Sequence, residues 1–292
     1  MSDASTSAGS SSDGPTADTT TALAVVLDCS EGWSGESFDD FGRVLDQMLM
    51  FLNAFHLTAA NNQLLLLAAH SAGVLCLWPP PEAGADAVAA PVNPCRLREL
   101  VLVGVQSLFE SQLARVPPTD ASNESIAPPL LSAALSTVLL RLQRAQRLRP
   151  KVEQRMLVLH ASADAPAQHL SAMNSIFAAV KLGALIDAVV FSPSDSMVLQ
   201  QAAHLTGGLY LRPNAATRRA LAQYLITCVL PDRFARQFVR APAQEEPETR
   251  ALCFESQQLL SKGFACSVCL AVFSHDRLPI CSVCSTRFAV PI

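Results

Sequence analysis

Hydrophobic and polar positions along this chain follow two different periods. Short, continuous apolar runs, partly β-branched, are typical of buried strands. Such runs occupy residues 22–28, 63–70, 73–78, 155–160, 185–191 and 208–212. Elsewhere apolar residues recur at every third or fourth position, which is the pattern of one helix face. These segments are 38–52, 97–108, 131–142, 170–180, 197–205 and 221–230. The pattern therefore predicts six strands that mostly alternate with helices.

The lengths of the connections decide how these strands pair. Only Ser71 and Ala72 separate the runs 63–70 and 73–78. A parallel crossover needs a dozen or more residues, so this pair must be antiparallel. The remaining strands are joined through helices, which favours parallel neighbours. We therefore predict an α/β fold with a doubly wound sheet, mainly parallel with one antiparallel edge strand. In such sheets the binding crevice lies at the carboxyl ends of the strands.

Composition divides the chain into four parts. Residues 1–20 are rich in Ser and Thr and should be disordered. The sheet domain is expected over 21–230, with irregular inserts at 79–94 and 116–129 to which the sequence assigns no role. A linker with prolines and mixed charge follows at 231–250, and a small second module occupies 251–292.

The loop after the first strand, residues 27–35, carries a partial metal-site pattern. A D-x-S-x-S site would place oxygen ligands at Asp28, Ser30 and residue 32, but residue 32 is Gly. Asp164 could supply the later aspartate, whereas the insert offers Ser125 and no well-placed threonine. Hard cations need several oxygen ligands, so these residues argue against magnesium binding. Trp33 is either an exposed interface side chain or a lid on the sheet.

The strongest chemical signal is a pair of C-x-x-C motifs. Cys266 and Cys269 form the first motif, and Cys281 and Cys284 form the second. Two such knuckles close a tetrahedron around zinc, with each Zn–S distance near ~2.3 Å. Protein sulfurs would fill all four positions, so we predict one structural zinc ion per chain. Disulfides or free thiols are the alternative, and His275 and Cys253 are spare candidate ligands.

Composition and charge narrow the function further. The chain is 50% hydrophobic and 16% charged, with a net charge of -4, which gives no general attraction to nucleic acid or anionic membranes. Residues 251–292 carry Lys262, Arg277 and Arg287 against two acidic residues, so primary DNA binding by the module is weakly supported. Neither a basic-then-apolar leader nor a bilayer-long apolar stretch is visible.

The scattered cysteines read as buried small hydrophobes: Cys29, Cys76, Cys95, Cys228 and Cys253.

No catalytic motif is found. The chain lacks a phosphate-binding G-x-x-x-x-G-K-[ST], a G-x-G-x-x-G after the first strand and a G-x-S-x-G elbow. His70 and His160 close two strands and read as hydrogen-bonded structural residues. The residues alone therefore identify no candidate for catalysis.

Several segments together resemble a known family. They are "LAVVLD" with the nearby tryptophan, "NNQLLLLAAH", "MNSIFAAVKLGALIDAVVF", "LQQAAHLTGGLYL" and "GFACSVCLAVFS" followed by "PICSVCSTRF". From about residue 22 to 288 they look like the smaller von Willebrand factor A-like, zinc-containing core subunit of general transcription factor IIH. The glycine-glycine-leucine-tyrosine stretch and the doubled C-x-x-C are specific when taken together.

The resemblance implies a function through protein contacts. A non-catalytic, nuclear subunit is expected, acting in RNA polymerase II initiation and nucleotide excision repair. Its von Willebrand A-like domain would dock on the RING-like zinc domain of the complex's second von Willebrand A subunit. The zinc ligands carry over to Cys266, Cys269, Cys281 and Cys284. The chain departs from the family by keeping only Cys253 ahead of the knuckles and by stopping without a basic tail.

Two other functions stay open on the sequence. One is a metal-dependent ligand-binding domain that uses Asp28 and Ser30. The other is a nucleic-acid binder that uses the zinc module.

Overall fold

The structure is a computed structural model, in which the described residues are 20–30, 33, 37–59, 61–80, 94–113, 128–244, 251–256, 259–268, 271–274 and 280–287. Most of the N-terminal tail and of the two inserts lies outside these residues. The strands of the main sheet are β1 (Thr21–Asp28), β2 (Gln63–His70), β3 (Gly73–Trp78), β4 (Glu153–His160), β5 (Leu185–Val190) and β6 (Tyr210–Leu211). The helices are α1 (Ser37–Thr58), α2 (Pro94–Leu113), α3 (Leu131–Leu148), α4 (His169–Leu182), α5 (Met197–Thr206), α6 (Ala215–Arg219) and α7 (Leu221–Tyr224).

The six-stranded sheet has the order β3-β2-β1-β4-β5-β6. All neighbouring strands run parallel except β2 and β3, which are antiparallel. The predicted mainly parallel sheet with one antiparallel edge strand is therefore confirmed. The order reverses at β1, whose neighbours are β2 and β4, so the ends of these strands form the crevice.

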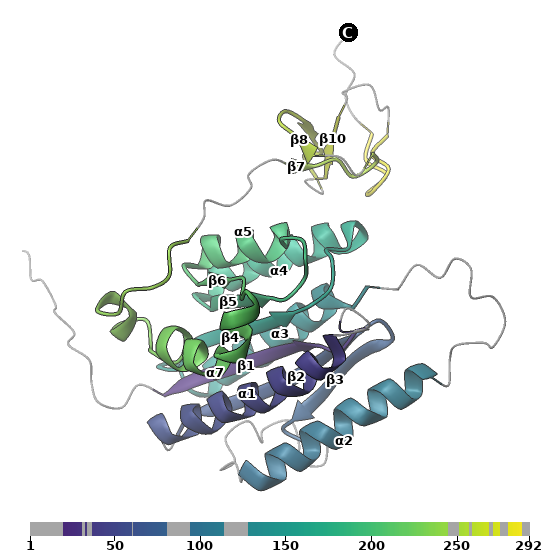
Figure 1. Ribbon diagram of the computed structural model, residues 1–292. Coiled ribbons are helices and arrows are strands. Elements are labelled where there is room, and N and C mark those ends of the chain that lie inside the picture. Colours follow the sequence, from purple (N-terminus) through teal and green to yellow (C-terminus); the bar gives the residue numbers. More distant parts are fainter. Residues whose placement is uncertain are drawn as a thin grey trace, which may run out of the picture.

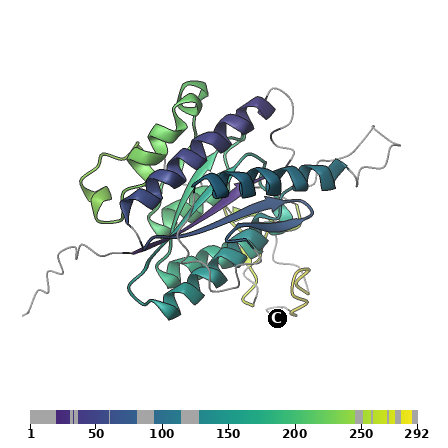
Figure 2. The same cartoon turned by 90° about the horizontal axis from the view of Figure 1, so that it is seen from below.

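Helices cover both faces of the sheet (Figure 1). Helices α1, α2 and α7 lie on one face, and α3, α4 and α5 lie on the other, as the view from below also shows (Figure 2). Each face has its own core because side chains alternate along a strand. On β1, Leu23, Val25 and Leu27 pack toward α1, whereas Ala24 and Val26 pack toward α3. The first strand is buried on both faces, which explains its unbroken apolar run.

The last helical segment starts earlier than its apolar period predicts. Asn214 caps α6 by accepting a hydrogen bond from the Thr217 backbone N–H at 2.9 Å. The chain turns at Ala220 before α7, and Leu225–Val229 continue as a wider π-helical turn. At this junction Gln47 of α1 donates to the Arg218 carbonyl and accepts from the Ala222 N–H, both at 3.0 Å. The capped first turn has no apolar period of its own, so the sequence pattern missed it.

Two adjacent glycines let α5 return to the sheet. Gly207 adopts a left-handed φ of 74° and ends α5. A side chain at Gly208 would place its Cβ against the Ile186 carbonyl, with only 1.8 Å between the atoms. Glycine is therefore required for β6 to pair with β5 here.

A buried charge cluster joins the sheet to the segment that follows its last helix. Arg155 on β4 and Asp187 on β5 lie on the same face of the sheet and are almost fully buried. Arg236, from the single turn Ala235–Gln237, donates to both Asp187 oxygens at 2.7 and 2.5 Å. Arg155 Nη2 lies 3.5 Å from the same carboxylate. These contacts hold the start of the predicted linker against the sheet domain.

The described residues of the C-terminal module form short strands. β7 (Ala251–Leu252) pairs antiparallel with β8 (Leu259–Leu260), and β9 (Phe264–Ala265) pairs antiparallel with β10 (Val272–Phe273). Its buried cluster is small and includes Cys266, Phe273 and Cys281. The domain boundaries stay a prediction. Across the described helices, none is long and apolar enough to cross a membrane.

Candidate metal centre

Three of the four predicted zinc ligands come together in the C-terminal module. The sulfur atoms of Cys266, Cys281 and Cys284 all lie within 4.8 Å of one another, and Cys266 Sγ is 3.6 Å from Cys284 Sγ. Cys266 follows β9, whereas the other two belong to the second knuckle. Cys269 and His275 lie outside the described residues. The complete ligand set therefore remains a prediction.

The spacing of these sulfurs fits zinc better than a disulfide. Two sulfurs that are each ~2.3 Å from a tetrahedral zinc ion lie about 3.8 Å apart. The 3.6 Å between Cys266 and Cys284 is close to this value, whereas a disulfide requires about 2.05 Å. Thiolate sulfurs are also ligands that zinc prefers. The three cysteines present can hold zinc, with a fourth ligand supplied from outside the group.

Backbone turns aim the second knuckle at the centre. Cys281 donates its N–H to the Thr286 carbonyl at 2.8 Å, and its carbonyl accepts from the Ser285 N–H at 2.9 Å. Ser285 has a φ of 59°, the left-handed conformation that glycine adopts most easily. The Thr286 hydroxyl lies 3.0 Å from the Cys284 sulfur and can donate to a thiolate there. The turn is therefore formed at a cost in backbone energy at Ser285.

Replacing Ser285 with glycine is expected to stabilise the module. The substitution removes the steric cost of a left-handed L-residue, roughly 1 kcal/mol. The Ser285→Gly chain should need a higher chelator concentration to lose half its metal, whereas Ser285→Val should need less. Metal release followed with a colorimetric indicator measures both. Equal midpoints for the three chains would contradict the role of the turn.

The other cysteines are not equivalent to these three. In the described part of the chain, Cys253 is not a member of the close group. Burial tends to raise the pKa of its thiol, but hydrogen bonds from Ser256, Glu255 and Ser274 lower that pKa to about 7. Cys29 and Cys228 are buried as predicted, but Cys76 is half-buried and Cys95 is exposed on α2. The prediction that the five scattered cysteines are core residues is therefore wrong for Cys76 and Cys95.

The loop with the partial metal-site pattern is closed by hydrogen bonds within the protein, in line with the expectation that it does not bind magnesium. Asp28 Oδ1 accepts from the Ser30 N–H at 3.0 Å and from the Ser30 hydroxyl at 2.6 Å. Asp28 Oδ2 accepts from the N–H groups of Ala161 and Ser162 at 3.0 Å and from the Ser162 hydroxyl at 2.8 Å. His160 Nδ1 lies 3.0 Å from the same oxygen. Both carboxylate oxygens are therefore engaged, and a cation would have to displace these donors.

These contacts also fix the charge of Asp28. Burial alone would raise its pKa, but His160, Ser30 and the Ala161 N–H favour the ionised form and hold the pKa of this carboxyl below its usual value. Ser162 was not predicted as part of the site. It lies two residues after β4, the strand beside β1, so knowledge of the strand order would have pointed to it.

Magnesium is expected to leave the stability of this chain unchanged. A ligand that binds only the folded state raises the unfolding temperature, but Asp28 offers no open oxygen here. Thermal unfolding with and without millimolar magnesium chloride, matched for ionic strength with sodium chloride, measures this. An upward shift specific to magnesium would contradict the closed site.

Substituting Asp28 with asparagine is expected to destabilise the fold in a pH-dependent way. The lost charge-assisted hydrogen bonds should cost about 1–3 kcal/mol near neutral pH. Because the folded pKa is depressed, this stability is present above the unfolded pKa of about 3.9 and is lost as pH falls below it. Urea unfolding between neutral and acidic pH should therefore show the two chains converging in acid. A constant difference at all pH values would contradict this account.

Two other residues of the predicted loop site have structural roles. Asp164, the candidate later aspartate, makes hydrogen bonds at the start of α5. Its oxygens accept from the Ser196 hydroxyl at 2.5 Å and the Val198 N–H at 3.2 Å. Trp33 is only 2% exposed, packs against Phe41 and Phe191, and donates its indole N–H to the Asp28 carbonyl at 2.9 Å. The lid interpretation of Trp33 is correct, and the interface interpretation is wrong.

The prediction of hydrogen-bonded structural histidines holds for His70 but is wrong for His160, whose two ring nitrogens are buried without a hydrogen-bond partner among the described residues. His70 Nδ1 accepts from the Ala72 N–H at 3.0 Å in the β2–β3 turn. His160 is buried against Asp28, as described above. The His160 ring also lines a small cavity of about 20 Å³ together with Asp164 and Pro129.

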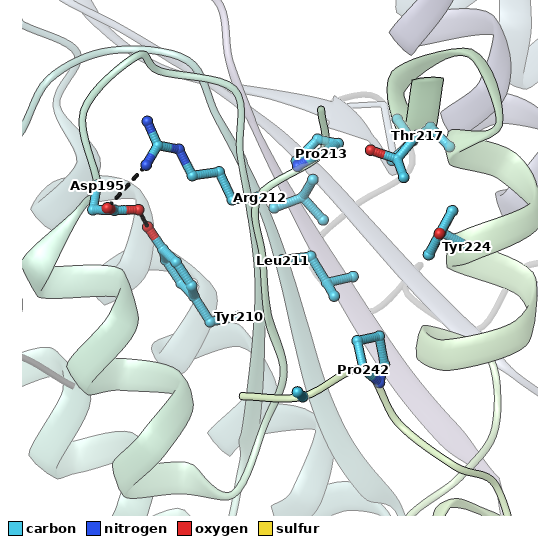
Figure 3. Close-up of a pocket in the computed structure, with 11 residues that line it drawn as sticks. Asp195, Tyr210, Leu211, Arg212, Pro213, Thr217, Tyr224 and Pro242 are labelled. Carbon is cyan, nitrogen blue, oxygen red and sulfur yellow. Dashed lines mark hydrogen bonds and ion pairs between the residues drawn. The ribbon is translucent and has the colours of Figure 1, made fainter. Parts of the chain in front are cut away.

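A pocket of about 270 Å³ lies beside the edge strand β6, between α6–α7 and Pro242 (Figure 3). Three of its polar side chains, Asp195, Tyr210 and Arg212, bond to one another. Asp195 accepts from Arg212 at 2.9 Å and from the Tyr210 hydroxyl at 3.1 Å. Burial raises the pKa of Tyr210 to about 12. The tyrosine therefore stays protonated near neutral pH, which lets its hydroxyl donate to Asp195.

Comparisons with known proteins agree with this architecture. A family model for transcription factor Tfb4 matches residues 20–285. General transcription factor IIH subunit 3 of Dictyostelium discoideum is 30% identical over 269 residues, covering 89% of this chain and 71% of that protein. General transcription and DNA repair factor IIH subunit tfb4 of Schizosaccharomyces pombe is 31% identical over 285 residues, covering 94% and 90%.

A solved structure supports the fold. The crystal structure of the TFIIH p34 N-terminal domain is similar, with a TM-score of 0.57 and 22% identity, over 73% of this chain and 99% of that chain. The predicted von Willebrand factor A-like fold is confirmed. Together with the match that spans nearly the whole sequence, these similarities establish that the chain belongs to the transcription factor Tfb4 family.

Proposed function

We propose that this chain is a non-catalytic structural subunit of the general transcription factor IIH core. It would act in the nucleus, in RNA polymerase II transcription initiation and in nucleotide excision repair. Relatives at 30% and 31% identity are named as subunits of this factor, and the second name adds DNA repair. Membership of the Tfb4 family supports this assignment.

The closed carboxylate of Asp28 carries the non-catalytic part of the proposal. In a doubly wound sheet the crevice at the strand ends is where a ligand would bind. Here the acidic residue at that crevice accepts hydrogen bonds from Ser30, Ala161 and Ser162. Asp28, which lies where this fold would bind a ligand, therefore connects the end of β1 to the residues after β4. Surface contacts with other subunits are then the function best supported.

We assign the main contact to the complex's second von Willebrand A subunit, through its RING-like zinc domain. The zinc in this chain would be structural, one ion per chain, held by Cys266, Cys269, Cys281 and Cys284. The module offers little for nucleic acid, since Lys262 and Arg287 are its basic side chains among the described residues. A nucleic-acid role for the module is therefore not proposed.

Co-expression with the other core subunits tests this function. The tagged chain should elute from a sizing column together with those subunits in equal amounts and should retain them in high salt. Omitting the second von Willebrand A subunit should release this chain from the assembly. Elution of the chain alone when all subunits are present would refute the proposal.

A further inference from the structure

The helical layer formed by α3, α4 and α5 contains no acidic residue. Across Leu131–Leu148, His169–Leu182 and Met197–Thr206 there is no Asp or Glu, although the whole chain has a net charge of -4. The opposite layer is different, because α1 contains Asp46 and α2 contains Glu99 and Glu110. Acidic residues are therefore distributed unevenly between the two helical layers of the sheet domain.

Basic side chains concentrate at the C-terminal half of α3. Arg144 and Arg147 are exposed and Arg141 is half-buried. The chain continues with exposed Arg149 and Lys151 directly after the helix. A favourable interaction with the helix dipole accounts for basic residues in the last turn only. Arg141 and Arg144 lie further back, so the dipole does not explain the cluster.

Two leucines share this face with the arginines. Leu140 is 68% exposed and Leu148 is 66% exposed. Successive helical residues are ~100° apart, so Leu140, Arg141, Arg144, Arg147 and Leu148 fall within a stripe of about 120°. The buried residues of α3, such as Val138, Leu139 and Leu142, face the sheet on the other side. We call these five exposed or half-buried residues the basic face of α3.

We propose that the basic face of α3 binds an acidic protein segment that carries apolar anchors. The arginines would pair with carboxylates, for which the guanidinium geometry is suited. Leu140 and Leu148 are about 12 Å apart along the helix at 1.5 Å per residue, and would receive two apolar side chains of the segment. Phosphate backbones offer no partner for exposed leucines, so the leucines favour a protein over nucleic acid. This inference goes beyond the proposed function and does not depend on it.

Fluorescence polarisation with the isolated full-length chain tests the proposal, so its result is independent of complex assembly. The probes are a labelled peptide built of Glu, Asp, Leu and Phe, its twin with Lys at every acidic position, and a labelled DNA duplex. The acidic peptide should bind, and its affinity should fall as salt is raised. Arg144→Glu with Arg147→Glu should weaken this binding at least tenfold and should make the Lys twin bind.

Matched variants separate the contribution of the leucines to peptide binding from that of the arginines. Leu140→Ser with Leu148→Ser should weaken the acidic peptide several-fold, while Arg96→Glu with Arg240→Glu, the same charge change at exposed positions elsewhere, should have little effect. Unchanged unfolding temperatures verify that each variant is folded. The proposal is overturned if the acidic peptide does not bind, if the charge reversal leaves its binding unchanged, or if DNA binds more tightly and ignores the leucine changes.

Discussion

Replacing Cys281 with serine is expected to remove zinc from the chain and to unfold residues 251–292, while the sheet domain stays folded. Cys281 is 1% exposed and lies within 4.8 Å, sulfur to sulfur, of Cys266 and Cys284. A serine hydroxyl replaces the thiolate poorly as a zinc ligand. Among the described residues the module's buried cluster is small, so we expect metal binding to supply most of its folding free energy, about 10–16 kcal/mol in comparable zinc sites.

Elemental analysis and hydrogen exchange of the full chain measure the two consequences. Zinc should fall from one ion per chain to well below that, and amides of the module should lose protection while those of β1 and β4 keep it. Cys95→Ser is the matched control, because Cys95 is exposed on α2 and lies outside the sulfur group. Retention of full zinc by the Cys281 variant, or an equal loss in the control, would contradict the ligand assignment.

The strand pattern could be predicted from the sequence because local geometry determines it. The two residues between β2 and β3 permit only an antiparallel pair, and the helices between the other strands favour parallel ones. The run 208–212 was longer than the observed β6, which is Tyr210–Leu211. Edge strands have one neighbour only, so an apolar run does not fix how many of their residues form hydrogen bonds.

The state of the metal loop could not be predicted in the same way. Whether Asp28 is open depends on Ser162 and Ala161, which are more than a hundred residues away in sequence. The orientation of Trp33 likewise depends on Phe191, which follows β5. The sequence shows a tryptophan flanked by glycines. Only the packing of its loop against Phe41 and Phe191 shows that its ring is buried. Long-range contacts of this kind have no periodic signal.

A sequence signal for the buried charges was present. Arg155 begins the run "RMLVLH", and Asp187 lies within the otherwise apolar run "LIDAVVF". Charged residues are almost never fully buried unless they are paired. Two opposite charges in neighbouring buried strands therefore predict a pair. The third member, Arg236, carried no such signal because it lies in a segment without a period.

Substituting Asp187 with asparagine is expected to destabilise the sheet domain by about 3–5 kcal/mol, because it removes one partner of a buried charge cluster. Arg155 would keep its hydrogen bonds to the Leu230 and Val229 carbonyls but would lose its nearby negative charge. Burial lowers the pKa of Arg155, and Asp187 opposes that shift. Arg236 is partly exposed and can turn toward water, so Arg155 should account for most of the loss.

Urea unfolding compared with Asp195→Asn isolates the effect of burial. Asp195 also pairs with an arginine, Arg212 at 2.9 Å, but both side chains are more than 40% exposed, so its loss should cost about 1 kcal/mol or less. If Asp187→Asn does not fold, a double variant with Arg155→Met and Asp187→Leu should recover most of the stability. In that variant Arg155 no longer leaves a buried positive charge without its partner. Equal losses for the Asp187 and Asp195 variants, or no recovery in the double variant, would show that packing rather than charge holds β4, β5 and the segment around Arg236 together.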